Sequence, residues 1–183
     1  MQLDHPDISE VLVSPEQIQQ KVVELAKQID THYKGGNVLC VGVLKGAVMF
    51  MADLLREMGE PVEMDWMAVS SYGSGTTSSG VVRILKDLDT DVVGRDVLIV
   101  EDIVDSGLTL SWLTANLKAR GAKSVEVVTL LRKPDAIQVE IDVRWVGFDI
   151  PNEFVVGYGL DYAEHYRSLK GVGVLNPEVY RKK

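Results

Sequence analysis

A run of seven consecutive apolar residues, VLCVGVL at 38–44, constrains the fold of this chain more than any other stretch. A strand that is apolar at every position must be covered on both faces, which is the usual situation in a parallel sheet. Runs of similar character lie at 96–100 and 125–131, and segments with helical spacing lie between the runs. Strands that alternate with helices in this way predict an α/β fold with a mainly parallel central sheet flanked by helices.

Shorter patterns predict the remaining elements. Ser14, Pro15 and Glu16 supply a capping hydroxyl, a first-turn proline and an acid, as the start of a helix prefers. Apolar residues at helical spacing continue this helix to Ile29. The other predicted helices are 47–58 and 108–119, and the predicted strands are 8–13, 38–44, 62–68, 81–85, 96–100, 125–131, 143–148 and 154–158.

Length and charge limit the class of protein. The 183 residues suit one domain, which we expect to span 1–183. A net charge of −8 argues against non-specific binding to nucleic acid. No apolar run approaches the roughly 20 residues of a membrane span, and the first residues do not resemble a signal peptide. The single cysteine, Cys40, lies in an apolar run, where we expect a buried thiol. Taken together, these features predict a cytoplasmic protein with no nucleic-acid or membrane partner.

The stretch VLIVEDIVDSGLTL (97–110) carries the clearest chemical signal. Residues 105–109, Asp-Ser-Gly-Leu-Thr, predict a strand-to-helix turn whose amides and hydroxyls suit a phosphate dianion. The turn is neither a Walker loop nor a Gly-x-Gly-x-x-Gly fingerprint. Glu101 and Asp102 would repel a bare phosphate, but they suit sugar hydroxyls or a Mg²⁺ that the ligand carries. A phosphorylated sugar with free hydroxyls and a metal-bound pyrophosphate suits both the turn at 105–109 and the two acids before it. The expected ligand is therefore 5-phosphoribosyl-1-pyrophosphate.

This stretch resembles the phosphoribosyl-pyrophosphate motif of the type I phosphoribosyltransferases, and the rest of the chain resembles their hypoxanthine-guanine branch. Residues 44–46 are similar to the pyrophosphate loop and 71–80 to the flexible catalytic loop, while 130–135 and 146–169 are similar to the purine-binding segments. The resemblance implies the fold of that family, with a small hood. It also implies a purine salvage reaction that transfers the 5-phosphoribosyl group to N9 of hypoxanthine or guanine. The products would be IMP or GMP and pyrophosphate, with Mg²⁺ as cofactor.

The resemblance implies roles for individual residues. Glu101 and Asp102 would hold the ribose hydroxyls and Mg²⁺, Asp161 would be a further metal-binding acid, and Asp105 would handle the ring proton at purine N7. The peptide bond before Lys45 can be cis in this family. The other implied contacts are those of Asp105, Ser106, Gly107, Leu108 and Thr109 with the 5′-phosphate, those of Lys45, Gly46 and Arg167 with pyrophosphate, and those of Ser71 and Tyr72 in a loop that covers the reaction centre.

The resemblance also implies how the base is bound. Lys133 would donate to the 6-oxo group and Phe154 would stack on the ring. Val155, through its backbone, and Asp161 would read the pyrimidine edge. Arg144 is a second candidate for the 6-oxo contact, because some relatives have a lysine directly before the Val-Gly-Phe strand. Either cation would favour oxopurines over adenine.

Other classes of protein share parts of this pattern. VLIVED also resembles the first strand of a response-regulator receiver, with Asp149 as phosphate acceptor, but that reading needs two further strands and only 150–183 follow. A second alternative is a regulator of the same fold that binds the ligand without catalysis. The presence of Asp105 and Lys45-Gly46 argues against it, because a regulator would not need these catalytic residues. Within the enzyme class, a xanthine-preferring transferase is the nearest alternative. We expect a homodimer or a homotetramer, and the sequence does not choose between them.

Overall fold

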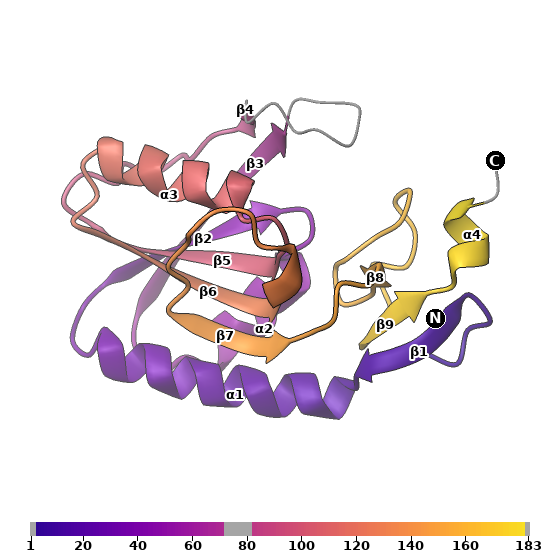
Figure 1. Cartoon of the computed structure of the whole chain (residues 1–183). Helices are drawn as coiled ribbons and strands as arrows, with labels where there is room; N and C mark the ends of the chain where they lie inside the picture. The colour runs from indigo at the N-terminus through magenta and orange to yellow at the C-terminus, as the bar shows by residue number, and fades with distance from the viewer. Residues whose placement is uncertain (1–2, 72–81, 182–183) are drawn as a thin grey trace.

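The computed structural model describes residues 3–71 and 82–181, and its central feature is a six-stranded sheet (Figure 1). The strand order is β4-β3-β2-β5-β6-β7. All neighbouring strands are parallel except the edge strand β4, which is antiparallel to β3. The strands are β2 (Val38–Leu44), β3 (Val62–Ser71), β4 (Val82–Lys86), β5 (Asp96–Val104), β6 (Ser124–Arg132) and β7 (Trp145–Asp149).

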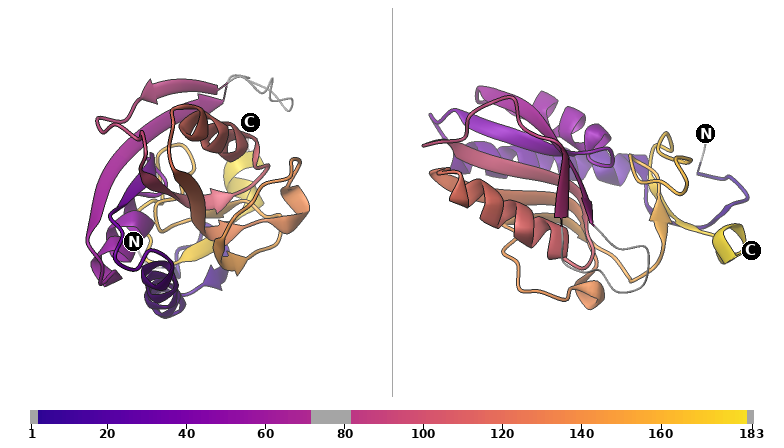
Figure 2. Two further views of the ribbon diagram at one scale, coloured as in Figure 1. Left: turned by 90° about the vertical axis from the view of Figure 1, so that its left-hand side faces the viewer. Right: turned by 90° about the horizontal axis from the view of Figure 1, so that it is seen from above.

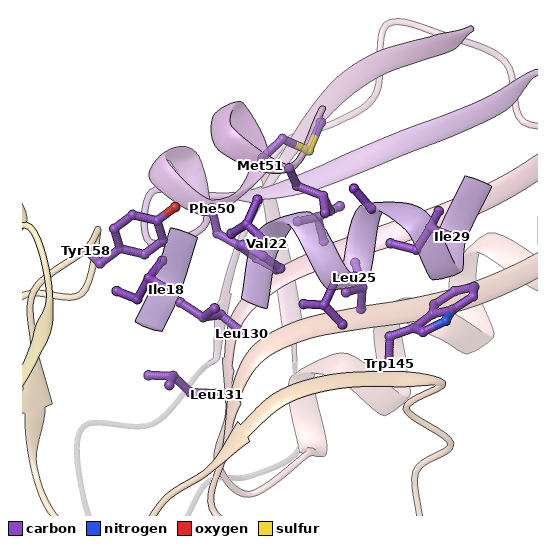
Figure 3. Close-up of a cluster of buried hydrophobic side chains, with 14 of the residues drawn as sticks. Ile18, Val22, Leu25, Ile29, Phe50, Met51, Leu130, Leu131, Trp145 and Tyr158 are labelled. Atoms are coloured by element: carbon purple, nitrogen blue, oxygen red, sulfur yellow. The ribbon is translucent and has the colours of Figure 1, made fainter. Parts of the chain in front are cut away.

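Helices cover both faces of this sheet. α1 (Pro15–His32) and α2 (Val48–Glu57) lie on one face and α3 (Leu108–Ala119) lies on the other (Figures 1 and 2). Alternate residues of β2 enter two separate cores, so that Cys40 packs in the core of α1 and α2, while Leu39 and Val41 pack in the core of α3. Figure 3 shows the core that contains α1 and α2. The predicted α/β fold is therefore confirmed, as is the explanation for the apolar run at 38–44.

The start of α1 follows the capping pattern in the sequence. Ser14 Oγ accepts a hydrogen bond from the amide of Gln17, and the Gln17 side chain accepts one from the amide of Ser14 (3.2 and 2.8 Å). This reciprocal capping box satisfies two of the amides that a helix start leaves unpaired. None of the helices that the structure describes is long and apolar enough to cross a membrane.

The lone cysteine has the environment that its position in an apolar run predicts. Cys40 is fully buried, and this burial raises the pKa of its thiol to about 12. Because the thiolate is the reactive form of cysteine, this environment fits the buried structural thiol that the sequence predicts.

A second, three-stranded antiparallel sheet forms a hood over one end of the molecule. It consists of β1 (Ile8–Val13), β9 (Val172–Leu175) and β8 (Val155–Val156), in the order β1-β9-β8. The short helix α4 (Pro177–Arg181) follows β9. The hood lies beyond the end toward which the parallel strands of the large sheet point (Figures 1 and 2).

The structure differs from the predicted elements in several places. The strand predicted at 154–158 is only β8 (Val155–Val156), and β3 continues to Ser71. β5 continues through Val104, so Glu101 and Asp102 lie on the strand itself and not after it. β7 begins at Trp145, which leaves Arg144 outside the strand. The hood strand β9 and the helix α4 were not predicted from the sequence.

Candidate active site

The candidate site lies where the central parallel strands end and face the hood. Lys45 follows β2, Asp105 follows β5, and Lys133 follows β6. These three strands are neighbours in the sheet, with β5 between β2 and β6. The carboxyl ends of parallel strands bring such residues to one edge, which is where open α/β sheets bind their ligands.

The turn between β5 and α3 encloses a cavity of about 130 Å³. Gly107 has a φ of 81°, a left-handed conformation that glycine adopts without a steric penalty, and α3 begins at the next residue. Apart from a long contact of 3.4 Å between Ser106 Oγ and the Leu108 amide, no side chain caps this helix. Its first amides can therefore bind an anion. The cavity is lined by Glu101, Ile103, Val104, Asp105, Ser106, Gly107, Thr109 and Leu110.

Two adjacent acids of β5 lie beside this site: Glu101 lines the cavity, and Asp102 packs against Gly46 of the turn after β2. Glu101 is buried, and its burial followed by the neighbouring charge of Asp102 raises its pKa well above the ordinary value. Burial also raises the pKa of Asp102 to about 6, against the lowering effects of the Ile103 amide, which donates to Asp102 Oδ1 at 2.7 Å, and of Arg167. Two carboxyls in such a place are stabilised as anions by a cation or by hydroxyl donors from a ligand.

Asp105 and Lys133 form an ion pair beside the cavity. Lys133 Nζ lies 3.1 Å from Asp105 Oδ2 and donates a hydrogen bond to it. The lysine is 7% exposed, whereas the Asp105 side chain is 57% exposed. The Lys133 amide also donates to the carbonyl of Val104 at 2.9 Å, which ties the end of β6 to the end of β5. The structure thus places an accessible carboxylate and a buried ammonium side by side.

The turn after β2 faces the hood segment at 157–167. The Leu44–Lys45 peptide bond is cis, as the family resemblance allowed. Lys45 Nζ lies 3.0 Å from Glu164 Oε2. Arg167 lies 3.1 Å from Asp161 and 3.2 Å from Glu164, and it donates to the carbonyl of Gly159 at 2.7 Å. Two cations that the sequence predicts for pyrophosphate are therefore held near each other through a shared acid.

The backbone of this turn is closely packed. A Cβ on Gly46 would lie 1.7 Å from Asp102 Oδ2, and a Cβ on Gly159 would lie 2.0 Å from the carbonyl oxygen of Gly46. These distances are far below van der Waals contact, so glycine at both positions allows the hood, the turn after β2 and the acid of β5 to meet.

Three of the residues predicted for the base, Phe154, Val155 and Asp161, come from the hood and the segment that follows β8. Val155 lies on β8, where it pairs with Val174 of β9, and it is buried. Phe154, directly before β8, is 40% exposed, which leaves part of its ring open to a ligand. Asp161 accepts a hydrogen bond from the Glu164 amide at 2.9 Å in addition to pairing with Arg167.

Other predicted residues do not join this group. Arg144 lies 3.4 Å from Glu126, near the start of β6, and its guanidinium stacks on Trp145 at 5.3 Å, so it is at the opposite end of the sheet. Ser71 is the last residue of β3, and the rest of the predicted covering loop, Tyr72 included, lies outside the described residues. Within the described ranges, no three His, Cys, Asp or Glu side chains are gathered as a ready-made metal site.

Sequence reasoning missed one charged residue of this site. Glu164 pairs with both Lys45 and Arg167, and the hydrogen bond from Lys45, followed by that from Arg167, lowers its pKa. Lys45 is 119 positions away in the chain, and Glu164 was given no role within the predicted purine-binding segment 146–169. Its spacing of three residues from Arg167 was the available signal.

The fold and this site define a phosphoribosyltransferase. Residues 12–163 match the family model described as phosphoribosyl transferase domain, and the chain belongs to that family. Within it, the chain belongs with the hypoxanthine-guanine phosphoribosyltransferases, as the sequence resemblance predicted.

Two kinds of relative support this placement. The hypoxanthine-guanine phosphoribosyltransferase of Mycobacterium bovis is 58% identical over 181 residues, which cover 96% of this chain and 90% of that protein. A hypoxanthine phosphoribosyltransferase from Staphylococcus aureus has a crystal structure that matches with a TM-score of 0.94 and 48% identity, over 96% of both chains. The Trypanosoma cruzi enzyme in complex with the product IMP matches with a TM-score of 0.90 and 42% identity, over 97% of this chain and 99% of that one.

Proposed function

We propose that residues 1–183 form one catalytic domain that transfers the 5-phosphoribosyl group from 5-phosphoribosyl-1-pyrophosphate to N9 of hypoxanthine or guanine. The bond from N9 to C1′ of the ribose forms as the bond from C1′ to pyrophosphate breaks, and the products are IMP or GMP and pyrophosphate. The observation that carries this proposal is the Asp105–Lys133 pair beside the anion cavity. The pair places a proton acceptor, Asp105, next to a hydrogen-bond donor, Lys133. N7 and O6 of an oxopurine lie along one edge of the ring, so the two side chains could contact these two atoms together.

The phosphates and the ribose would bind along the ends of β2 and β5. The 5′-phosphate would occupy the cavity at the start of α3, where free amides and two hydroxyls surround it. Glu101 and Asp102 would hold the ribose hydroxyls. Lys45 and Arg167 would bind the leaving pyrophosphate after exchanging their present carboxylate partners for its oxygens.

Mg²⁺ fits the acids that are present. It is usually bound by one or two carboxylates together with substrate phosphates and water, which suits the pair Glu101 and Asp102 on one strand and Asp161 across the site. When bound, Mg²⁺ would neutralise charge that accumulates on the departing pyrophosphate. The raised pKa values of both strand acids support a cation there, because a cation would stabilise their ionised forms.

The base would lie between the hood and the end of β6. Lys133 would donate to O6, Asp105 would take up the ring proton at N7, Phe154 would stack on the ring, and Val155 and Asp161 would read the pyrimidine edge. The reacting carbon has the character of a ribosyl cation, so catalysis depends on placed charge and on the exclusion of water.

A substrate panel tests the proposed function. Purified protein is mixed with the sugar pyrophosphate, Mg²⁺ and each of hypoxanthine, guanine, xanthine and adenine, and nucleotide formation is followed by absorbance. We expect turnover with the first two bases. A marked preference for xanthine would identify the alternative transferase, and binding of the sugar pyrophosphate without turnover would identify a non-catalytic regulator.

The two candidates for the O6 contact can be separated by substitution. Lys133→Ala should raise the KM for hypoxanthine and for guanine by about tenfold, because a hydrogen bond from a charged donor is lost. Arg144→Ala should leave both KM values within about twofold, because this side chain lies at the other end of the sheet. The opposite pattern in steady-state kinetics would show that the base is placed wrongly.

The packing at Gly46 predicts a loss of activity on adding a single methyl group. Gly46→Ala should lower kcat/KM for the sugar pyrophosphate by about 100-fold, because either Asp102 or the turn must move by ~1 Å. Gly59→Ala is the matched control, since a Cβ there would make an ordinary contact of 3.5 Å with Asp30. Wild-type kinetics in Gly46→Ala would mean that this close approach has no part in binding the substrate.

The assembly and the compartment stay predictions. A homodimer or homotetramer is expected from the family, and sedimentation velocity on the purified chain would decide between them. A cytoplasmic location is expected from the lone reduced cysteine, Cys40.

A further inference from the structure

Three aromatic rings pack together beside β8. The ring centroids of Phe154 and Tyr180 are 5.2 Å apart, with 34° between the ring planes. Tyr162 meets Phe154 edge to face at 5.9 Å and 88°, and it lies 6.3 Å from Tyr180. These separations fall within the range in which aromatic pairs attract each other beyond simple burial of area. Phe154 is therefore held by rings from two other segments while 40% of its own surface stays exposed.

Tyr180 comes from α4, which is fixed to the hood by contacts that do not involve the Phe154 ring. The amide of Asn176, just before α4, donates to the carbonyl of Asp7 at 2.7 Å. Val179 packs against the small core that includes Val156 of β8. Figures 1 and 2 show α4 on the side of the hood away from the six-stranded sheet. The helix that carries Tyr180 thus lies on the side of the hood away from the proposed catalytic edge (Figures 1 and 2).

We propose that Tyr180 is a positioning residue for the purine, because its ring supports Phe154 from behind and fixes the tilt of the surface on which the base stacks. This inference rests on the proposed function, in which Phe154 is the stacking residue. It extends the purine site to the last helix of the chain, which belongs to none of the segments predicted to bind the substrate.

The physical reason is the cost of ordering an exposed side chain. A half-exposed phenylalanine without a backing ring samples several orientations, and purine binding would then have to select one of them. With Tyr180 and Tyr162 in place, the orientation is set before the base arrives. The sugar pyrophosphate should be much less sensitive to this support. Lys45 and the cavity at 105–109 lie at the ends of β2 and β5, and Arg167 of the hood is held by Asp161 and Glu164 and not by the aromatic rings.

The test compares Tyr180→Leu with Tyr180→Phe. The leucine variant should raise the KM for hypoxanthine and guanine, and the Kd of IMP measured by calorimetry, by about three- to tenfold. Its KM for the sugar pyrophosphate should change by less than about twofold, because that substrate does not contact the aromatic rings. Tyr180→Phe should restore wild-type values, because no hydrogen bond of the Tyr180 hydroxyl is found among the described residues. If the leucine variant lowers the melting temperature strongly, Tyr180→Met, which fills the space without a ring, takes its place.

A double-mutant cycle shows whether Tyr180 acts through Phe154. In a Phe154→Leu background the effect of Tyr180→Leu on the purine KM should vanish. Glu178→Ala is the matched control, because it trims an exposed side chain of the same helix without removing a ring, and it should leave the purine KM unchanged. An equal rise in Glu178→Ala, or an effect that persists without Phe154, would overturn the inference.

The outcomes also separate this inference from the proposed function. If Phe154→Leu raises the purine KM and Tyr180→Leu does not, the function stands and the positioning role of Tyr180 fails. If Phe154→Leu itself leaves the purine KM unchanged, Phe154 is not the stacking residue, and both the inference and that part of the proposed function are wrong.

Discussion

Asp105→Asn should lower kcat by about 100- to 1,000-fold, because the side chain that accepts the purine ring proton is replaced by one that cannot. The amide oxygen of asparagine can still accept the hydrogen bond from Lys133, so the buried lysine keeps a partner and the fold should be retained. The KM for the sugar pyrophosphate should change little, since proton transfer is the function that is lost. Steady-state kinetics with the sugar pyrophosphate as the varied substrate, at saturating hypoxanthine, measures both quantities.

A distant acid provides the control for this variant. Asp142 is exposed and lies outside the segments predicted to bind the substrate, so Asp142→Asn makes the same chemical change away from the site. Its kcat should equal that of the wild type. Near-normal turnover in Asp105→Asn would move the general base to another residue.

Removal of Mg²⁺ should abolish turnover. An excess of chelator leaves the charge of the leaving pyrophosphate without compensation, and it leaves Glu101 and Asp102 facing the substrate without a cation between them. Activity should return when Mg²⁺ is added in excess of the chelator. Circular dichroism in chelator should match that of the untreated protein, because hydrophobic cores hold both sheets together.

Undiminished nucleotide formation in excess chelator would sink the assignment of these acids as metal ligands. A second measurement then tests their other proposed contact. Glu101→Gln should raise the KM for the sugar pyrophosphate whether the acid binds Mg²⁺ or a ribose hydroxyl, and an unchanged KM would remove Glu101 from the site.

The large sheet could be predicted from the sequence because its signals are local. The apolar run at 38–44 coincides with β2, and the helix predicted at 108–119 coincides with α3. Both depend on periodicity and on turn residues that lie within the segment itself. The predicted strand at 96–100 was shorter than β5, because the acids Glu101 and Asp102 interrupt the apolar run and look like its end. A strand that borders a ligand site can carry acids without ending there.

The hood was harder to predict because its contacts are distant in sequence. β9 has only four residues and pairs with β1 through partners such as Val13 and Val172, so its stability does not come from its own sequence. α4 is shorter than a helix that could form alone, and packing against the hood holds it. The same distance explains why Glu164 was missed while Lys45, its partner, was found through a local motif.

Each cation proposed to touch substrate already has a protein anion beside it: Lys45, Lys133 and Arg167 are all paired with carboxylates. A small anion such as inorganic phosphate, arriving at one of these side chains, must displace a tethered carboxylate and gains little from the exchange. A ligand that carries a pyrophosphate, a ribose and a phosphate on one framework makes several exchanges in a single binding event. The carboxylates of the protein thus compete with the anionic groups of a ligand for these cations. The site favours a ligand that replaces several of these carboxylates at once over one that replaces a single carboxylate.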